Sequence, residues 1–403
     1  MQHVNYLILG AGPAGLAFAH SLLARGETSF LVLEKESVAG GLCRSQEVDG
    51  APLDIGGGHF LDVKRQEVLD LLFRFLPEAE WLRHDRIATI RLRGVEVGHP
   101  LEANLWQLPV ADQVDFLESI AQAGSVRDMP MPETFDAWIA WKLGERIADE
   151  YMLPYNRKIW STELNALGLY WLYKLPDVSF RDTLLSCLSR KPAGSLPAHG
   201  TFLYPRRHGY GEVWRRMGEA LGERLLTDTP VSRVDLSRMT VNDTFTARRI
   251  VTTIPWDIWP RIADVPATIG DRMSSLRVVS VDIDYVGEDC PSPAHWIYEP
   301  DERKPYHRIL CRKNFCGGAR GYWTETNSLR AAEATGWRYR NDYAYPLNTI
   351  GKPDAVAEIA AWAEEREVYG LGRWGTWEHM NSDVAVAAGM ALAGRLTAER
   401  AAL

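Results

Sequence analysis

The chain has 403 residues, a formal net charge of −8 and a hydrophobic content of 46%. This length exceeds one typical hydrophobic core and predicts two or three domains. The acidic balance argues against a broad basic surface for nucleic acid. No segment reaches the ~18 uninterrupted apolar residues that a membrane-spanning helix requires, and the first residues form no basic-then-apolar leader. We therefore expect a cytoplasmic protein with no nucleic-acid partner and no membrane span.

The cysteines are odd in number, widely spaced and without paired Cys-x-x-Cys units. Cys311 and Cys316 lie close in the sequence, but no histidine-rich stretch accompanies them. We therefore expect reduced thiols and no metal site at Cys43, Cys187, Cys290, Cys311 and Cys316.

The first predicted element is a buried strand over 6–9, which leads into Gly10, Gly12 and Gly15. Apolar residues then recur at helical spacing until Gly26, so the three glycines fall at a strand-to-helix turn. In such a turn the first glycine permits the tight bend, the second lets the backbone approach a pyrophosphate, and the third lets helix pack on strand. The helix N-terminus offers free N–H groups to the phosphates.

Glu34 ends the next apolar run, Phe30–Leu33. It follows the glycines at about 20 residues, the distance at which an acidic side chain accepts hydrogen bonds from an adenosine ribose. Strand, glycines, helix, second strand and carboxylate together predict a dinucleotide-binding unit. The alternative is a glycine-rich turn between packed elements.

The next part of the chain predicts a helix over 63–76 and a hairpin of strands 87–92 and 95–97 around Arg93-Gly94. A mainly helical insertion follows over 105–188, with an amphipathic helix over 135–151.

The later elements return to alternation of strand and helix. The pattern predicts a strand over 201–205, a helix from Gly209 to Leu221, a strand over 249–255 and a β-branched sheet strand over 276–285. The chain closes with an alanine-rich helix over 384–403. Its N-cap is Ser382 or Asp383, which would turn the positive end of the helix toward a bound anionic group.

Two further glycine stretches carry a resemblance to a known group. Residues 39–45 place a glycine pair and an arginine directly after the dinucleotide unit, and residues 54–60 place three glycines before a histidine. In these stretches the chain resembles the flavoprotein superfamily of amine oxidases, protoporphyrinogen oxidase, UDP-galactopyranose mutase and the flavin-free GDP-dissociation inhibitors. The resemblance implies FAD as cofactor, bound by Gly10, Gly12, Gly15, Glu34, Gly41, Arg44, Gly57, Gly58, Arg373 and Asp383.

Later stretches resemble the UDP-galactopyranose mutases, namely residues 154–160, 201–205, 295–300 with 306–308, 343–349, and 372–377 with 381–383. The resemblance implies a nucleotide-diphosphate sugar as substrate, bound by Tyr155, Trp160, Tyr298, Arg308, Tyr345 and His379. It implies that His59 lies over the flavin and that Arg308 and Lys174 stabilise the diphosphate, so that His59, Arg308 and Lys174 form the catalytic set. On the residues alone, His59 is more often a turn residue and each tyrosine more often a packing residue. For Arg308 and Arg373 a solvated guanidinium group is the alternative to a binding role.

Three features depart from the mutase pattern. Lys174 stands where the mutases carry an arginine on a mobile loop, and a lysine keeps the charge but loses the bidentate fork. His379 stands where a substrate tyrosine is expected, and residues 98–104 replace an aromatic and glutamine pattern near the base in fungal members. The nucleobase and the sugar therefore stay open.

The fold class expected from the resemblance is α/β, with a Rossmann-type FAD-binding domain, an inserted helical domain and an antiparallel β-sheet substrate domain. We expect the FAD-binding domain to comprise residues 1–80, 195–270 and 365–403. The mainly helical substrate or cap insertion would comprise residues 81–194, and the β-sheet substrate domain residues 271–364.

The function implied is that of an FAD-dependent nucleotide-sugar pyranose/furanose mutase in cell-surface polysaccharide biosynthesis. In this mutase N5 of the reduced flavin attacks the anomeric carbon with no net redox change. NADH or NADPH stays open as external reductant, and a homo-oligomer stays open as the assembly. The alternatives are an FAD-dependent oxidoreductase of the amine-oxidase type and a flavin-free binding protein like the GDP-dissociation inhibitors. The intact glycines and Glu34 argue against the second.

Overall fold

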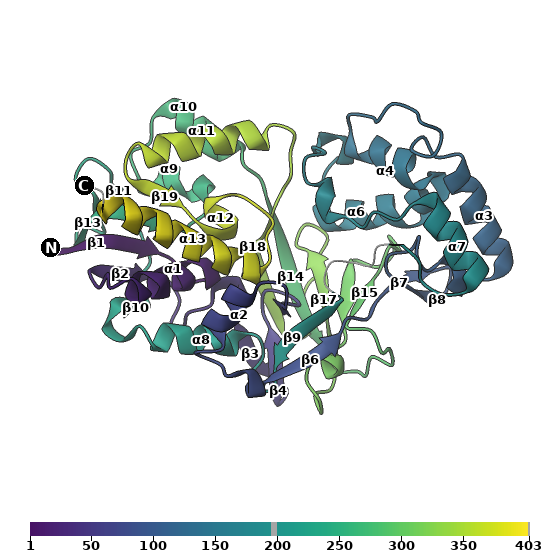
Figure 1. The fold of residues 1–403 in the computed structure, drawn as a ribbon, viewed down its shortest axis with the longest axis horizontal. Coiled ribbons are helices and arrows are strands. Elements are labelled where there is room, and N and C mark those ends of the chain that lie inside the picture. The colour runs from purple at the N-terminus through teal and green to yellow at the C-terminus, as the bar shows by residue number, and fades with distance from the viewer. Residues whose placement is uncertain (195–199, 402–403) are drawn as a thin grey trace. The chain divides into compact units, whose positions relative to one another are not determined.

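The computed structural model describes residues 1–194 and 200–401. The chain divides into two compact units, with residues 1–83, 203–277 and 351–403 in unit 1 and residues 84–202 and 278–350 in unit 2 (Figure 1). The predicted domain boundary at residue 195 and the last two residues of the predicted C-terminal helix lie outside the described residues.

Unit 1 is built on a seven-stranded sheet in the order β10-β2-β1-β13-β12-β11, with β19 also pairing with β13. The pairs β10–β2, β2–β1, β1–β13 and β13–β19 are parallel, whereas β11, β12 and the start of β13 form antiparallel pairs. The residues of β2 are all buried, as expected of a parallel strand covered on both faces. These strands are β1 (Gln2–Leu9), β2 (Phe30–Leu33), β10 (Leu225–Leu226), β11 (Val234–Asp235), β12 (Thr240–Val241), β13 (Phe245–Thr252) and β19 (Val368–Gly370).

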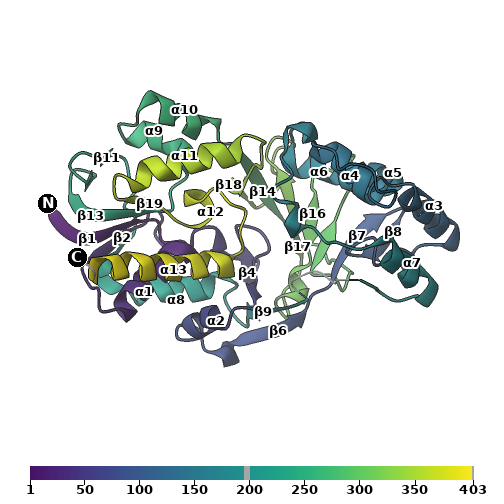
Figure 2. The ribbon, with the colours of Figure 1, turned by 45° about the horizontal axis from the view of Figure 1, so that its top comes forward.

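Helices α1 (Pro13–Ala24), α8 (Gly211–Glu219) and α13 (Ser382–Ala401) pack together in unit 1 (Figure 2). A Cβ on Gly389 of α13 would lie 2.5 Å from the carbonyl oxygen of Ala14, so a glycine lets the two helices approach closely. The other helices of the unit are α2 (Gln66–Leu72), α9 (Trp259–Ile262), α10 (Ala267–Ser275), α11 (Lys352–Glu364) and α12 (Gly372–Gly375). Its shorter strands are β3 (Ser45–Val48), β4 (Ala51–Asp54) and β5 (Leu61–Asp62), and the chain leaves and re-enters the unit in β6 (Trp81–Asp85) and β9 (Thr201–Pro205).

Unit 2 contains a second seven-stranded sheet in the order β18-β14-β17-β16-β15-β7-β8. Every neighbouring pair is antiparallel except β15 and β7. The register places Tyr298, Arg308 and Glu325 side by side on β15, β16 and β17. The strands are β7 (Ala88–Leu92), β8 (Val95–Gly98), β14 (Val278–Val286), β15 (Trp296–Tyr298), β16 (Arg308–Leu310), β17 (Tyr322–Asn327) and β18 (Arg338–Pro346).

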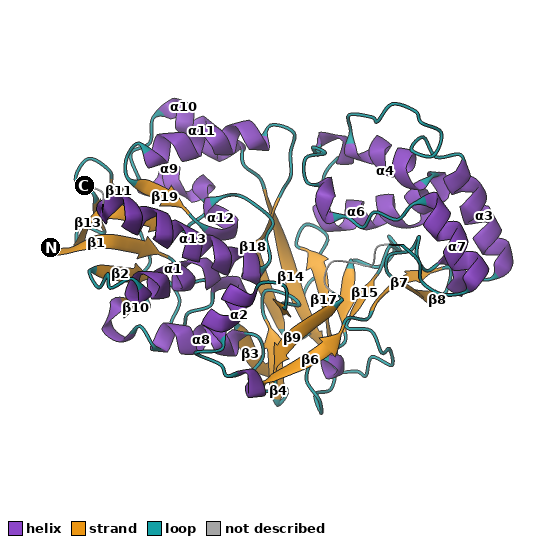
Figure 3. Ribbon diagram, viewed as in Figure 1, coloured by secondary structure: helices purple, strands orange, loops and turns teal. Residues whose placement is uncertain are grey.

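The α-helices of unit 2 come from one continuous stretch of the chain, and Figure 3 shows them in purple. They are α3 (Val110–Ala121), α4 (Phe135–Leu143), α5 (Glu145–Ile147), α6 (Leu153–Trp160) and α7 (Phe180–Ser189). The predicted single helix over 135–151 is wrong, because Gly144 takes a φ of +79° and ends α4. A π-helical turn over Ala148–Met152 then leads into α6.

Most predicted elements are confirmed at or near their expected bounds. The helix predicted over 63–76 is shorter, because α2 covers only Gln66–Leu72. The predicted N-caps Ser382 and Asp383 lie within the first turn of α13.

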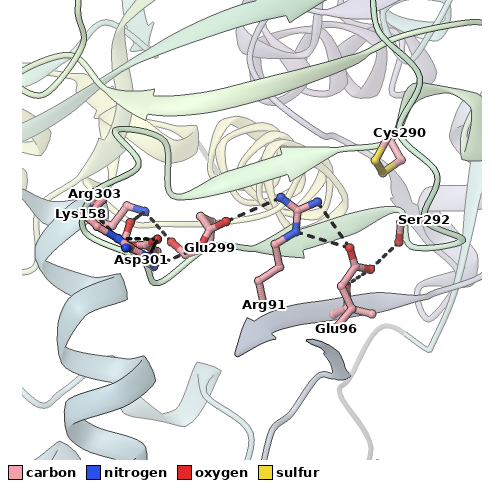
Figure 4. Close-up of polar contacts among 10 residues, drawn as sticks. Arg91, Glu96, Lys158, Cys290, Ser292, Glu299, Asp301 and Arg303 are labelled. Atoms are coloured by element: carbon pink, nitrogen blue, oxygen red, sulfur yellow. Dashed lines mark hydrogen bonds and ion pairs between the residues drawn. A yellow bond between two sulfur atoms is a disulfide. The ribbon is translucent and has the colours of Figure 1, made fainter. Parts of the chain in front are cut away.

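The expectation of reduced thiols is wrong for two cysteines. A disulfide joins Cys290 to Cys311, whose Cα atoms lie 5.8 Å apart although 21 residues separate them in the sequence. It packs in a buried apolar cluster with Ile297 of β15 and Ile309 of β16, and Figure 4 shows the disulfide at Cys290. Among the described residues, no helix is long and apolar enough to cross a membrane.

Candidate functional site

The glycine turn of unit 1 depends on the missing side chains of Gly10 and Gly15. Gly10 has a φ of +107°, and a Cβ there would lie 2.1 Å from Oγ1 of Thr253. A Cβ on Gly15 would lie 2.1 Å from the carbonyl oxygen of Gly10. The start of α1 therefore rests directly on the turn that leaves β1.

Gly12 and Gly41 form a cradle made of backbone. Gly12 is the N-cap of α1 and makes no side-chain capping bond, so the first N–H groups of the helix lack a cap from the chain. Gly41 has a φ of +53°, and a Cβ there would lie 3.2 Å from the Cα of Gly12. Side chains at either position would fill the space in front of the helix N-terminus. This arrangement fits a pyrophosphate.

Glu34 lies just after β2, and its carboxylate is held in place by backbone. Oε2 accepts a hydrogen bond from the Ala11 N–H at 2.8 Å, and Oε1 accepts one from the Glu36 N–H at 3.0 Å. The predicted ribose acceptor is thus fixed beside the glycine turn. Arg44 donates from Nε to the Gly41 carbonyl at 3.0 Å and from Nη1 to Oε2 of Glu36 at 3.1 Å. Arg44 therefore connects Gly41 to the loop that follows Glu34.

The glycine stretch within residues 54–60 lies against the one within residues 39–45. A Cβ on Gly56 would lie 1.9 Å from the carbonyl oxygen of Leu42. Gly57 has a φ of +95°, and Nδ1 of His59 donates to its carbonyl at 3.0 Å. The His59 ring stacks on Tyr210, with centroids 6.2 Å apart and planes 9° apart. His59 thus closes the turn that contains Gly57 and Gly58, and its ring also faces an aromatic side chain.

The C-terminal segment joins the same part of unit 1. Tyr210 shares a 2.5 Å hydrogen bond with Ser382 at the start of α13. Arg373 donates to the Met380 carbonyl at 2.8 Å. Burial raises the pKa of the Cys43 thiol to about 12, although the nearby Arg373 guanidinium lowers it. Arg373 is therefore close to Cys43, in the glycine stretch of residues 39–45.

Asp383 and His379, the other predicted site residues of this segment, lie in different surroundings. Asp383 is buried and pairs through Oδ2 with Nε of Arg65 at 3.3 Å. His379 is half-buried and belongs to unit 1. All other predicted substrate-binding residues belong to unit 2.

In unit 2 the central feature is a pair formed by the half-buried Arg308 and the buried Glu325. Oε2 of Glu325 accepts hydrogen bonds from both Nε, at 2.7 Å, and Nη2 of Arg308. Nη2 also contacts the Tyr345 hydroxyl at 3.2 Å. Burial raises the pKa of the Glu325 carboxyl, but Arg308 and His307 outweigh it and hold that pKa at about 2. Glu325 is therefore ionised and compensates the charge of Arg308.

Aromatic rings surround this pair. Tyr155 on α6 meets Tyr298 edge-on at 5.5 Å between centroids, and Trp160 meets Tyr345 edge-on at 6.5 Å. His99 packs against Tyr298 at 4.9 Å. The structure therefore brings together Tyr155, Trp160, Tyr298, Arg308 and Tyr345.

Four residues of this cluster were missed by sequence reasoning. Arg86 donates to the Tyr298 hydroxyl at 3.1 Å, and His99 packs against the Tyr298 ring. Nε2 of His307 lies 3.6 Å from Oε2 of Glu325. Only His99 had a signal, because it lies in the segment 98–104 that departs from the mutase pattern. The others are single polar residues in strands or their edges, which no local motif distinguishes.

A buried lysine holds α6 to the loop between β15 and β16 (Figure 4). Nζ of Lys158 donates to the carbonyls of Glu299 at 2.7 Å and Asp301 at 2.8 Å. Burial lowers its pKa to about 8. Arg91 lies between the carboxylates of Glu299, at 3.7 Å, and Glu96, at 3.5 Å. Lys158 thus connects the helix that carries Tyr155 to the strands that carry Tyr298 and Arg308.

Lys174 occupies a different environment. It ends a short 3₁₀ turn over Leu172–Lys174, is exposed, and its Nζ lies 5.6 Å from the centre of the Tyr173 ring. The preceding Trp171 meets Trp160 edge-on at 5.8 Å. The turn that carries Lys174 is therefore attached to the aromatic cluster through Trp171.

Comparison of sequences finds matches that cover short parts of the chain. A model of the NAD(P)-binding Rossmann-like domain matches residues 8–76. Putrescine oxidase of Kocuria rosea is 44% identical over 68 residues, which cover 17% of this chain and 14% of that protein. An uncharacterized protein in the nifH2 3′ region of Methanothermococcus thermolithotrophicus is 48% identical over 53 residues, which cover 13% of this chain and 50% of that protein. This chain thus spans half or less of the length of these two relatives.

Comparison of structures finds matches that cover nearly the whole chain. Reduced UDP-galactopyranose mutase matches with a TM-score of 0.89 at 22% identity, covering 98% of this chain and 94% of that chain. Putrescine oxidase bound to putrescine matches with a TM-score of 0.65 at 16% identity, covering 98% and 99%. Cyclohexylamine oxidase from Brevibacterium oxydans matches with a TM-score of 0.66 at 15% identity, also covering 98% and 99%. The chain therefore has a Rossmann-like NAD(P)-binding domain and the fold of UDP-galactopyranose mutase, a fold that it shares with these two oxidases.

Proposed function

We propose that this protein is an FAD-dependent mutase that interconverts the pyranose and furanose forms of a nucleotide-diphosphate sugar. The observation that carries the proposal is the Arg308 guanidinium, held by Glu325 and surrounded by Tyr155, Tyr298 and Tyr345, in a chain with the mutase fold. Guanidinium groups bind phosphate oxygens through two parallel hydrogen bonds, so this cluster suits an anionic diphosphate.

Unit 1 would hold FAD. The cradle of Gly12 and Gly41 fits its pyrophosphate, and Glu34 would accept hydrogen bonds from its adenosine ribose. Gly57, His59 and Arg373 would line the flavin end. When bound in its reduced form, FAD supplies a nucleophile for the anomeric carbon, and no net redox change results.

The residues of this chain would orient the substrate and stabilise charge. Arg308 would bind the diphosphate as it departs and returns, with Lys174 as a second cation. Tyr155 and Trp160 would face the nucleotide, and the hydroxyls of Tyr298 and Tyr345 would contact the diphosphate. His379 would contact the sugar. No acid–base pair is needed, because the departing diphosphate carries stable negative charge.

The proposal is tested with purified holoenzyme reduced without oxygen, by dithionite and separately by NADH or NADPH. Nucleotide-sugar pyranoses and furanoses are incubated with it and separated by chromatography, with the oxidised enzyme as control. Interconversion by the reduced enzyme alone supports the mutase and identifies its substrate. Absence of interconversion across the panel, together with substrate-dependent flavin reduction, would replace the mutase with an oxidoreductase.

The second candidate function is an oxidoreductase of the amine-oxidase type. The 44% identity to putrescine oxidase over 68 residues favours it. The Arg308 cluster argues against it, because a guanidinium repels a cationic amine. Oxygen consumption with putrescine and cyclohexylamine distinguishes the two functions.

A further inference from the structure

We infer that His307 is a proton-binding positioning residue of the diphosphate site. It takes up one proton when a diphosphate binds beside Arg308, and so supplies positive charge that the Arg308–Glu325 pair lacks. This inference rests on the proposed function, because it assumes that the Arg308 cluster binds a nucleotide-diphosphate sugar.

The position of His307 is determined by the sheet. Its backbone N–H donates to the Glu325 carbonyl at 2.9 Å, and its carbonyl accepts from the Glu299 N–H at 2.9 Å. The side chain is fully buried. Nε2 lies 3.6 Å from Oε2 of Glu325, the oxygen that also accepts from Arg308. Nδ1 has no hydrogen-bond partner among the described residues.

The charged groups around His307 are already engaged within the protein before a ligand binds. Arg308 on β16 and Glu325 on β17 neutralise each other. On α6, Lys158 is occupied by two backbone carbonyls. On the β15 side, the Glu299 carboxylate lies 3.7 Å from Arg91. A diphosphate with two negative charges would therefore meet cations that already have partners within the protein, with the charge of Arg308 compensated by Glu325.

The tyrosines near His307 do not supply the missing charge. The ring of Tyr155 lies 6.1 Å from the His307 ring, and burial raises the pKa of the Tyr155 hydroxyl. Tyr298 and Tyr345 carry hydroxyl groups, which can donate hydrogen bonds but bring no positive charge. Histidine is the side chain whose charge changes near neutral pH. Burial and the Arg86 charge lower the pKa of the other histidine, His99, to about 3, so His307 is the histidine of this cluster that can respond.

Without ligand, His307 is neutral. Burial lowers the pKa of its ring, and Arg308 and Lys158 lower it further, while Glu325 raises it. With Nε2–H directed toward Glu325, the free lone pair is on Nδ1. A negative charge within ~4–6 Å typically raises such a pKa by about 1–3 units. A proton from solvent then binds Nδ1, and no bond of the ligand breaks.

The test is calorimetric titration of the oxidised holoenzyme with UDP-glucose and, in parallel, GDP-mannose. Both phosphates of these probes are esterified, so the ligand keeps its charge across the neutral range. Titration in buffers of different ionisation enthalpy counts the protons taken up. We expect about one proton per bound ligand, and affinity that falls about tenfold per pH unit as pH rises above the ligand-bound pKa of His307.

The variants His307→Asn and His307→Gln keep a polar side chain that cannot bind a proton. We expect both to bind the probe with no linked proton and with affinity independent of pH. The matched control is His84→Asn, because His84 is another histidine of unit 2 and contacts the rings of Phe202 and His295. The control should keep the proton uptake of the native enzyme, and flavin absorbance should verify folding of every variant.

Two results would overturn the inference alone. The first is tight binding of a probe by the native enzyme without proton uptake, and the second is unchanged uptake in either folded His307 variant. Failure of both probes to bind the native holoenzyme would overturn the proposed nucleotide-sugar site and this inference with it.

Discussion

The two units organise their candidate sites in opposite ways. In unit 1 the site is mostly backbone, because Gly10, Gly12, Gly15 and Gly41 leave out side chains where a Cβ would clash or fill the cradle. In unit 2 the site is made of side chains, and Arg308 and its partners are separate in the sequence and meet through strand register. A backbone site is sensitive to added volume, whereas a side-chain site is sensitive to lost charge and lost orientation.

The largest effect should come from adding volume to the backbone site. In Gly15→Val, the new side chain clashes with the Gly10 carbonyl, since even a Cβ would lie 2.1 Å away. We expect loss of bound flavin and destabilisation of about 3 kcal/mol or more, because backbone cannot move aside cheaply. Flavin absorbance after gel filtration and denaturant unfolding measure both effects.

The matched control for this change is Gly270→Ala in α10, where no atom lies within 4 Å of the added Cβ. Flavin content should stay unchanged there, and stability should rise slightly, because alanine favours a helix over glycine. Full flavin occupancy in Gly15→Val would contradict the view that the turn has no room for a side chain.

The second-largest effect should come from replacing the planar guanidinium of Arg308 in unit 2. Arg308→Lys keeps the charge but loses the planar donors that contact Glu325 and Tyr345. We expect kcat/KM for the mutase reaction to fall about 100-fold with flavin binding intact. The control is Arg303→Lys, whose side chain is 90% exposed and pairs with Asp301. Equal losses in the two variants would show that Arg308 has no special role.

The third prediction concerns Lys158, which holds α6 beside β15 and β16. Its folded-state pKa of about 8 is below the ordinary 10.5, so the unfolded chain binds more protons between these values. Stability from this group therefore increases as pH rises from about 8 to 10.5, since burial penalises the ammonium below this range. We expect the difference in unfolding free energy between native and Lys158→Met protein to increase with pH over that range.

Denaturant unfolding at several pH values measures this difference. The Lys158→Met variant should also lose about 1–3 kcal/mol near neutral pH, because two buried carbonyls lose their donor. A difference that stays constant with pH would mean that Lys158 titrates at its ordinary value despite burial.

The smallest effect is expected at Lys174, which is exposed. Lys174→Ala should raise KM for the nucleotide sugar only a few-fold, about 3–10, and the effect should shrink at high salt, because exposed charges are screened. Steady-state kinetics at two ionic strengths measure it. A loss as large as that of Arg308→Lys would instead place Lys174 in direct contact with the diphosphate.

Much of the fold could be predicted from local pattern. The strands Phe30–Leu33 and Thr201–Pro205 have their predicted bounds, because apolar runs between turn residues define a strand locally. The helix over 135–151 could not be predicted as it is, since only the conformation of Gly144 divides it. The Cys290–Cys311 disulfide was missed for a related reason, because spacing in the sequence does not reveal which strands become neighbours.

The sequence by itself determined the dinucleotide-binding turn of this protein, since glycine spacing, an apolar strand and a carboxylate act within one stretch of chain. Only the tertiary structure decided that Glu325 and His307 share the environment of Arg308, and that Lys158 joins α6 to the β15–β16 loop. The physical reason is distance along the chain. A steric requirement on neighbouring residues is visible in local pattern, whereas an electrostatic network forms only when register and packing bring distant side chains within a few ångströms.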